Sequence, residues 1–70
     1  SELPKSDKVI RNKLEAETKQ HGNAYMHEKL SLIDAPAAKK IHPNDPQRVQ
    51  RALEVYQISG KTMTRLQQES

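Results

Sequence analysis

Two arginines and two glutamines lie close together near the middle of the 70-residue chain, in the run Gln47-Arg48-Val49-Gln50-Arg51. Arginine presents a planar fork of N–H donors that matches phosphate oxygens, and glutamine offers an amide donor and an acceptor suited to base edges. A run that supplies both kinds of side chain has the chemistry needed to hold a nucleic-acid backbone or an unstacked base. Whether the two arginines share a surface depends on the element that carries them.

The segment around this run has the residues that begin and end helices. Asn44 is a strong N-cap, Asp45 and Pro46 suit a first turn, and Gly60 supplies the left-handed residue typical of a helix C-terminus. These signals predict a helix of about fourteen residues. Both arginines then lie in its first two turns, where the positive end of the helix dipole favours an anion.

On a helical wheel this helix divides into three sectors. One is predicted to pack in the core and contains Val49, Ala52, Leu53 and Tyr56. A second is predicted to face solvent and contains Gln47, Gln50, Glu54 and Gln57. The third combines Arg48 and Arg51 with the apolar residues Val55 and Ile58.

The third sector suits neither solvent nor core. Solvent does not require Val55 and Ile58, and a core rejects arginines that have no partner. The sector is therefore interpreted as an interface. The alternative is that both arginines form salt bridges within the helix, Arg48 with Asp45 and Arg51 with Glu54.

The remaining candidates for chemistry are weaker. The residues His21, His27 and His42 are separated by six and fifteen positions without any cysteine, a spacing that does not favour a shared metal site. His27 is expected to be a partly exposed helix residue and His42 to position the turn before Pro43. Asp45 is better explained as a capping residue than as a general base. The sequence thus predicts no catalytic residue, cofactor site or metal site in this segment.

Four further helices are expected around the central one. The first runs from about Asp7 to Gln20 and ends at Gly22. Asn23 is expected to cap the second, and Asp34 with Pro36 to begin a short third one, which the His42-Pro43 step ends. Thr64, with Gln67 three residues later, resembles a capping box that opens a fifth helix.

These helices predict an all-α fold, a small bundle of four to five short helices. The second helix has an apolar stripe formed by Met26, Leu30 and Ile33, which is expected to pack against the core sector of the central helix. No stretch alternates apolar and polar residues over the length of a strand. The segment Ser1–Asp7 is expected to be extended, because Pro4 disfavours helix at the residue before it.

Composition limits the stability of such a bundle. Only 33% of the residues are hydrophobic, two tyrosines are the only aromatic residues, and there is no cysteine for a disulfide or a cysteine-based metal site. We therefore expect marginal stability, or dependence on protein surface outside the chain. Twelve Lys and Arg against nine Asp and Glu give a net charge of +3, which is a mild indication of a polyanionic partner. No apolar run approaches the roughly 20 residues that span a bilayer, so no membrane partner is expected.

The run from His42 to Tyr56, followed by Ile58-Ser-Gly-Lys61, closely resembles the signature of the bacterial tRNA dimethylallyltransferases, also called tRNA isopentenyltransferases. Other residues fall where that family's inserted helical region has comparable ones: Leu3-Pro4, Gly22, His27, Leu30, Asp34, Ala37-Ala38 and Ile41. The resemblance covers essentially the whole chain. It departs at Asn23, where many members have a tryptophan.

The resemblance implies an enzyme larger than this chain. Members transfer a dimethylallyl group from its diphosphate to N6 of the adenosine just 3′ of the tRNA anticodon, using Mg²⁺. Their catalytic core is a P-loop α/β domain of the nucleotide-binding (ATP-binding) type. A helical insertion in this domain binds the anticodon stem-loop. The P-loop is Gly-rich and ends in Lys-Ser/Thr. This chain has two glycines and no such motif, so the catalytic residues are expected outside it.

The resemblance therefore implies that residues 1–70 are one helical insertion domain, with residues 44–60 as the helix leading back towards the core. It places Gln47, Arg48, Val49, Gln50 and Arg51 against tRNA. The expected partners are the anticodon stem-loop and the catalytic core of the same enzyme, in a cytoplasmic monomer. The segment alone is expected to bind RNA weakly and to be inactive.

A different class of function stays open, that of a freestanding helical nucleic-acid-binding or adaptor domain without catalysis. A reading frame that continues upstream into a Gly-rich Lys-Ser/Thr loop would support the transferase. A start and a stop codon at these ends would exclude it.

Overall fold

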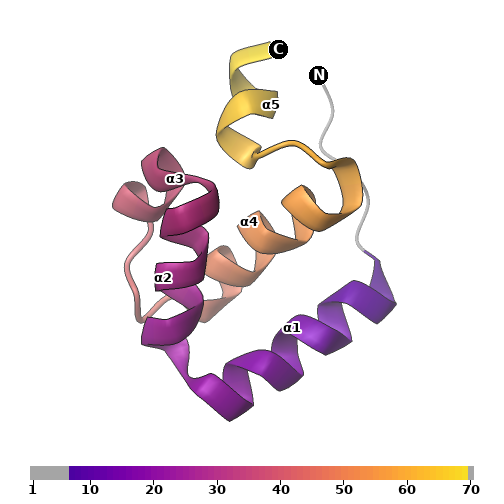
Figure 1. The fold of residues 1–70 in the computed structure, drawn as a ribbon, viewed down its shortest axis with the longest axis vertical. Helices are drawn as coiled ribbons and strands as arrows, with labels where there is room; N and C mark the ends of the chain where they lie inside the picture. Colours follow the sequence, from indigo (N-terminus) through magenta and orange to yellow (C-terminus); the bar gives the residue numbers. More distant parts are fainter. Residues whose placement is uncertain (1–6, 70) are drawn as a thin grey trace.

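The computed structural model describes residues 7–69, which form five helices and no strand (Figure 1). The helices are α1 (Lys8–His21), α2 (Asn23–Ile33), α3 (Ala35–Lys40), α4 (Pro46–Ser59) and α5 (Met63–Glu69). The all-α prediction is confirmed. The predictions for Leu3, Pro4 and the rest of residues 1–6 lie outside the described residues.

Local capping explains most of the helix ends. The Asp7 carboxylate accepts from the backbone N–H groups of Val9 and Ile10, and Asp34 accepts from that of Ala37, so each begins a helix as predicted. Gly60 ends α4 with a φ of 74°, the left-handed conformation that glycine adopts without strain.

Three predicted caps are wrong by one or two residues. Gly22, with a φ of 92°, ends α1 and directly precedes α2, so Asn23 is already helical. Asp45, not Asn44, caps α4, because the proline at the first helical position keeps the residue before it out of the α region. Thr62, not Thr64, accepts the backbone N–H of Arg65 at the start of α5.

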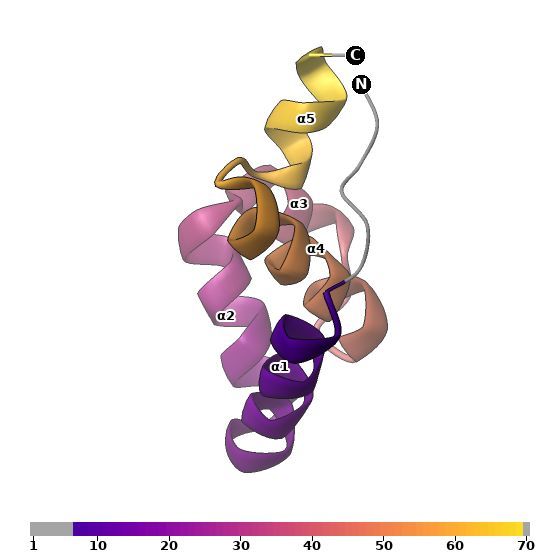
Figure 2. The ribbon, with the colours of Figure 1, turned by 90° about the vertical axis from the view of Figure 1, so that its right-hand side faces the viewer.

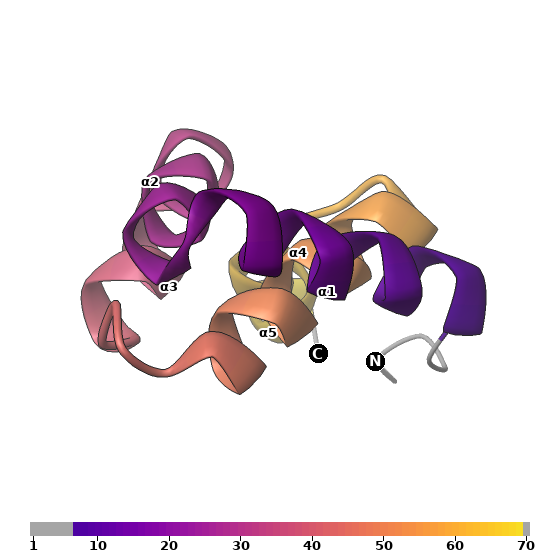
Figure 3. The ribbon, with the colours of Figure 1, turned by 90° about the horizontal axis from the view of Figure 1, so that it is seen from below.

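The core lies where α4 meets α1 and α2. Its buried members are Leu14, Met26, Leu30, Ala38, Val49, Ala52 and Leu53, with Ile10, Ile33, Ile41 and Met63 packed at its edge. The predicted packing of Val49, Ala52 and Leu53 near the Met26 stripe is therefore confirmed. Figure 2 shows α4 between α5 at one end of the molecule and α1 at the other, and Figure 3 shows α1 lying across it.

This central position buries more of α4 than the wheel predicted. Val55 is fully buried and Glu54 is 4% exposed, although they were assigned to the interface and solvent sectors. Tyr56, predicted to be in the core, is exposed. The wheel assumes one buried face, whereas α4 contacts α1, α2 and α5 and so has neighbours on several sides.

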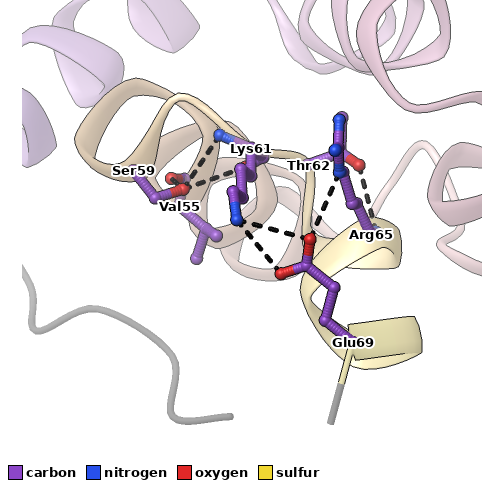
Figure 4. A network of polar contacts seen from close by, with 6 residues as sticks. All are labelled: Val55, Ser59, Lys61, Thr62, Arg65 and Glu69. Carbon is purple, nitrogen blue, oxygen red and sulfur yellow. Dashed lines mark hydrogen bonds and ion pairs between the residues drawn. The ribbon is translucent and has the colours of Figure 1, made fainter.

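Two polar networks attach α5, which otherwise packs only lightly on α3 and α4. The buried Asp34 carboxylate accepts from the Thr64 hydroxyl at 2.6 Å and from the Thr64 backbone N–H at 3.2 Å. At the other end, Glu69 accepts from Lys61 and Arg65, and Ser59 bonds the backbone of the α4–α5 turn (Figure 4). Together these contacts fix α5 beside α3 and α4.

Candidate nucleic-acid interface

The first two turns of α4 present the five predicted residues in different ways. Gln47 and Arg48 are exposed, Gln50 and Arg51 are partly buried, and Val49 is a core residue with 1% exposure. The run therefore does not form one continuous surface. Four of its side chains reach the surface, and Val49 holds their helix against the core.

Arg48 is the more accessible arginine. Its side chain is 75% exposed, and its Nε lies 3.3 Å from Oδ2 of Asp45, the residue that caps the same helix. An exposed ion pair at this spacing contributes only about 0–1 kcal/mol to stability. Arg48 can therefore exchange Asp45 for an anionic ligand at small cost.

Arg51 is held by a buried carboxylate. Its Nη1 donates to Oε1 of Glu54 at 2.9 Å, and the two side chains are 33% and 5% exposed. The other carboxylate oxygen of Glu54 accepts from the backbone N–H of Asp7 at 3.2 Å. Arg51 is thus tied to the start of α1 as well as to its own helix. Both salt bridges of the alternative interpretation are present, and both arginines still border the surface.

A groove runs beside these residues, between α3, α4 and the start of α5. We call it the α3–α5 groove; its volume is about 330 Å³, and it is lined by Ala37, Lys40, Ile41, Gln47, Arg48, Arg51, Met63, Thr64 and Gln67. Three of these side chains are cationic and, among the described residues, none that lines it is acidic. Such a lining attracts an anion.

A second hollow, of about 280 Å³, lies on the other side of α4, towards α1. It is lined by Arg11, Glu15, Gln47, Gln50, Arg51 and Glu54, so its two cations face two carboxylates. The Gln50 amide donates to the backbone oxygen of Arg11 at 3.4 Å and helps to close it. Balanced charge makes this hollow the weaker candidate for a polyanion.

Several lining residues of the α3–α5 groove were not identified from the sequence. Lys40 is the last residue of α3, and Met63 and Gln67 belong to α5. Met63 and Gln67 are far from Arg48 along the chain and reach it only through the packing of α5, whereas Lys40 reaches it through the packing of α3. One signal was available: Lys39 and Lys40 in the last turn of α3 concentrate positive charge a few residues before the α4 cap.

The three histidines lie in separate environments. His21 stacks on Tyr25, with ring centroids 4.3 Å apart. Nε2 of His27 lies 2.7 Å from the backbone oxygen of Ala38 and 2.8 Å from that of Ile41; because carbonyls only accept, this nitrogen donates and closes the end of α3. Nδ1 of His42 accepts from the Asn44 backbone N–H, so His42 does shape the turn before α4.

Within residues 7–69, no three His, Cys, Asp or Glu residues come together in a way that could hold a metal ion. The two buried carboxylates, Asp34 and Glu54, bond to groups of the protein itself. In the same part of the chain no helix is long and apolar enough to cross a membrane. Of the two hollows beside α4, the α3–α5 groove has the more basic lining.

Comparison with known proteins gives a consistent result. The sequence profile of a family described as IPP transferase matches residues 1–70. Among solved structures, the chain is similar to the full-length tRNA isopentenylpyrophosphate transferase from Bacillus halodurans, with 41% sequence identity and a TM-score of 0.75 over 87% of this chain. The match covers 20% of that protein, so this chain spans about a fifth of its length.

Proposed function

The chain belongs to the IPP transferase family, and we propose that it is the helical tRNA-binding insertion of a tRNA dimethylallyltransferase. The observation that carries the proposal is the α3–α5 groove, where Lys40, Arg48 and Arg51 face one hollow and no described lining residue is acidic. A tRNA backbone is the anion that the family's substrate supplies. Gln47 and Gln50 flank the arginines and offer amides to base edges.

The parent enzyme is proposed to transfer a dimethylallyl group from dimethylallyl diphosphate to N6 of the adenosine 3′ of the anticodon, releasing diphosphate. Its P-loop domain would carry out the chemistry in the cytoplasm, and residues 44–60 would lead from the insertion back to that domain. The role that we propose for this chain is to bind and orient the anticodon stem-loop.

We assign the Mg²⁺ of the parent enzyme to its catalytic domain and not to this chain. A magnesium site is built from carboxylate and other oxygen ligands together with substrate phosphates, and residues 7–69 bring no three acidic or histidine side chains together. The described residues that line the α3–α5 groove include no carboxylate, so the groove offers Mg²⁺ no acidic ligand. We therefore assign no step through magnesium to this chain.

RNA binding by the 70-residue chain tests the proposal. An anticodon stem-loop RNA should bind weakly, and the logarithm of its binding constant should fall linearly with the logarithm of salt concentration, because bound phosphates release counterions. Fluorescence anisotropy over a salt series measures both. No binding at low salt would refute the proposed role.

An activity assay tests whether catalysis is confined to another domain. The chain incubated with dimethylallyl diphosphate, Mg²⁺ and stem-loop RNA should give no modified adenosine, as measured by mass spectrometry of the digested RNA. Turnover by this chain alone would show that catalysis is not confined to another domain.

A further inference from the structure

The α3–α5 groove has a shape and lining that suit a smaller ligand than an RNA stem. We propose that it holds a single unpaired nucleotide of the bound RNA, with the base on the groove floor and a phosphate at its rim. This inference rests on the proposed function and adds to it the part of the RNA that the groove recognises.

The size of the groove favours one nucleotide. Its volume of about 330 Å³ lies at the lower end of the roughly 300–1,000 Å³ typical of small-molecule pockets. A double-stranded stem keeps its bases stacked inside and offers a broad convex surface, which cannot enter such a hollow. An unpaired base in a loop can be turned outwards and buried.

The lining residues of the groove include two kinds: buried or partly buried apolar residues, which we call the floor, and exposed basic residues, which we call the rim. Ala37, Ile41 and Met63 give the floor an apolar surface, and the flexible, polarisable thioether of Met63 can adapt to the face of a base. Lys40 and Arg48 stand at the same groove, and each can meet a phosphate oxygen. An apolar platform beside a basic track is the general arrangement of single-strand binding sites.

The groove is also held in place before any ligand binds. Thr64 lines it and donates twice to the buried carboxylate of Asp34, which joins α5 to the α2–α3 junction. On the α4 side, the bond between Arg51 and Glu54 orients one of the cations. A preformed site loses less free energy to ordering when it binds.

The two methionines of the chain provide a direct test. Met63 lies at the groove floor, and Met26 is a core residue with 2% exposure, so a sample labelled with ¹³C at the methionine methyl groups carries a probe and an internal control. A short single-stranded RNA should shift the Met63 methyl signal upfield through the ring current of the base, and Met26 should stay in place. A strand with the same phosphates but without bases should leave Met63 unmoved, and so should a blunt RNA duplex.

Adjacent lysines supply matched variants. Lys40 lines the groove and Lys39 does not, so Lys40→Gln and Lys39→Gln remove equal charge from neighbouring positions of α3. For the single strand, Lys40→Gln should make the salt slope shallower by about 0.7, the contribution of one phosphate contact, and Lys39→Gln should leave it unchanged. Equal effects of the two variants would contradict a phosphate site at the groove.

The outcomes separate this inference from the proposed function. If RNA binds while Met63 stays unmoved, or if the strand without bases moves it equally, the groove does not hold a base although the RNA-binding role survives. If no RNA binds at all, both proposals fail. A Met63 signal that moves only with an added protein segment would assign the groove to a protein partner instead.

Discussion

Arg48 and Arg51 are the same residue type three positions apart, yet the fold gives them different tasks. Arg48 is mostly exposed and shares an exposed ion pair with its own helix cap, whereas Arg51 bonds a carboxylate that is itself buried. Removing one partner of a surface ion pair changes stability little. Removing the partner of a buried charge leaves that charge without compensation inside the protein, which lowers the free energy of unfolding. Their substitutions should therefore separate binding from stability.

Arg48→Ala should weaken RNA binding without weakening the fold. We expect a loss of about 1–3 kcal/mol in RNA binding free energy, similar for different sequences, and a salt slope shallower by about 1. The midpoint of urea unfolding should stay close to that of the unchanged chain. Anisotropy and urea titration measure the two effects, and a large fall in the midpoint would show that Arg48 is mainly structural.

Arg51→Ala should weaken both properties. In the intact enzyme we expect tRNA use to fall by about 1–3 kcal/mol while diphosphate binding is retained. In the 70-residue chain the same change should also lower the free energy of unfolding, because Glu54 loses its cationic partner in a buried position.

The double variant Arg51→Ala with Glu54→Gln identifies the cause of that destabilisation. A neutral amide at position 54 should recover part of the lost stability, because no buried charge is left without its partner, and should not recover RNA binding. If the double variant recovers no stability, the unpaired carboxylate is not what makes Arg51 important for the fold.

For Arg51→Ala alone in the intact enzyme, an equal loss of tRNA binding and diphosphate binding would instead place Arg51 at the diphosphate site.

At the scale of the helices, the short α5 depends on contacts outside itself. Isolated helices shorter than about 12 residues are marginal in water, and α5 has seven. Asp34 holds its beginning through Thr64, Leu66 is buried, and Lys61 with Arg65 holds Glu69 at its other end. Because Met63, Thr64 and Gln67 line the α3–α5 groove, these contacts also maintain the candidate site.

Thr64→Val should loosen α5 selectively. The change keeps the side-chain shape but removes the hydroxyl that donates to the Asp34 carboxylate at 2.6 Å, and a hydrogen bond to a charged group is worth about 1.5–3 kcal/mol. Amide exchange should speed up in α5 and at the groove more than in α1. Thr18→Val is the matched control, since the Thr18 hydroxyl bonds only the Leu14 carbonyl within α1; equal effects on α5 would contradict the role of Asp34.

Acid should loosen the same helix from its other end. Hydrogen bonding from Lys61 has the largest effect on Glu69 and lowers its pKa below the ordinary value of 4.5; desolvation acts in the opposite direction, and the charge of Lys61 and then Arg65 lower the pKa further. A carboxylate whose pKa is lower in the folded state stabilises the fold above its unfolded pKa, and this contribution is lost as pH falls through the folded pKa. We therefore expect α5 amides to exchange faster below about pH 4.5, measured relative to α1, and Glu69→Gln to remove that difference.

Helix positions followed from local signals, whereas the burial of α4 did not. Asp7, Asp34 and Gly60 act within a few residues of their own position, so their roles could be predicted from sequence. Glu54 was expected in solvent, but its partners include Asp7, 47 positions away, and no local pattern indicates that contact. Thr64 carries a capping-box spacing, yet it bonds Asp34, 30 positions away.

The candidate site shows the same division. The run Gln47–Arg51 could be found from residue type and helix position, together with a family resemblance. The opposite wall of the α3–α5 groove could not, because Lys40, Met63 and Gln67 reach it only through the packing of α3 and α5. Binding residues on separate short elements leave little periodic signal in a sequence.

As a whole, the described part of the molecule is a thin slab of 34 × 26 × 16 Å. The axes of packed helices lie about 8–10 Å apart, so the shortest dimension has room for about two layers of helices, as where α1 lies across α4 (Figure 3). Few residues can then be surrounded on all sides, and the six largest fully buried side chains are Leu14, Met26, Leu30, Leu53, Val49 and Val55. We expect the stability of a fold with so small a core to increase measurably when a ligand binds its folded state.

RNA should therefore stabilise this chain against heat, and the charge of the groove should control the effect. A ligand at 100 times its dissociation constant adds about 2.7 kcal/mol to a folded state that alone binds it. In a domain of this size each kcal/mol corresponds to roughly 4–8 °C in Tm. Anticodon stem-loop RNA at that concentration should raise Tm by more than 10 °C, about the product of these two values, and added salt should reduce the shift.

The controls for this experiment decide which anion the chain recognises. Dimethylallyl diphosphate with Mg²⁺ should leave Tm unchanged, because the diphosphate site is assigned to another domain. The double variant Lys40→Gln with Arg48→Ala should keep the Tm of the unchanged chain without RNA and lose most of the RNA-induced shift, since both side chains line the groove and both are exposed. A shift by the diphosphate as large as that by RNA would instead assign the basic groove of this helical domain to the small substrate.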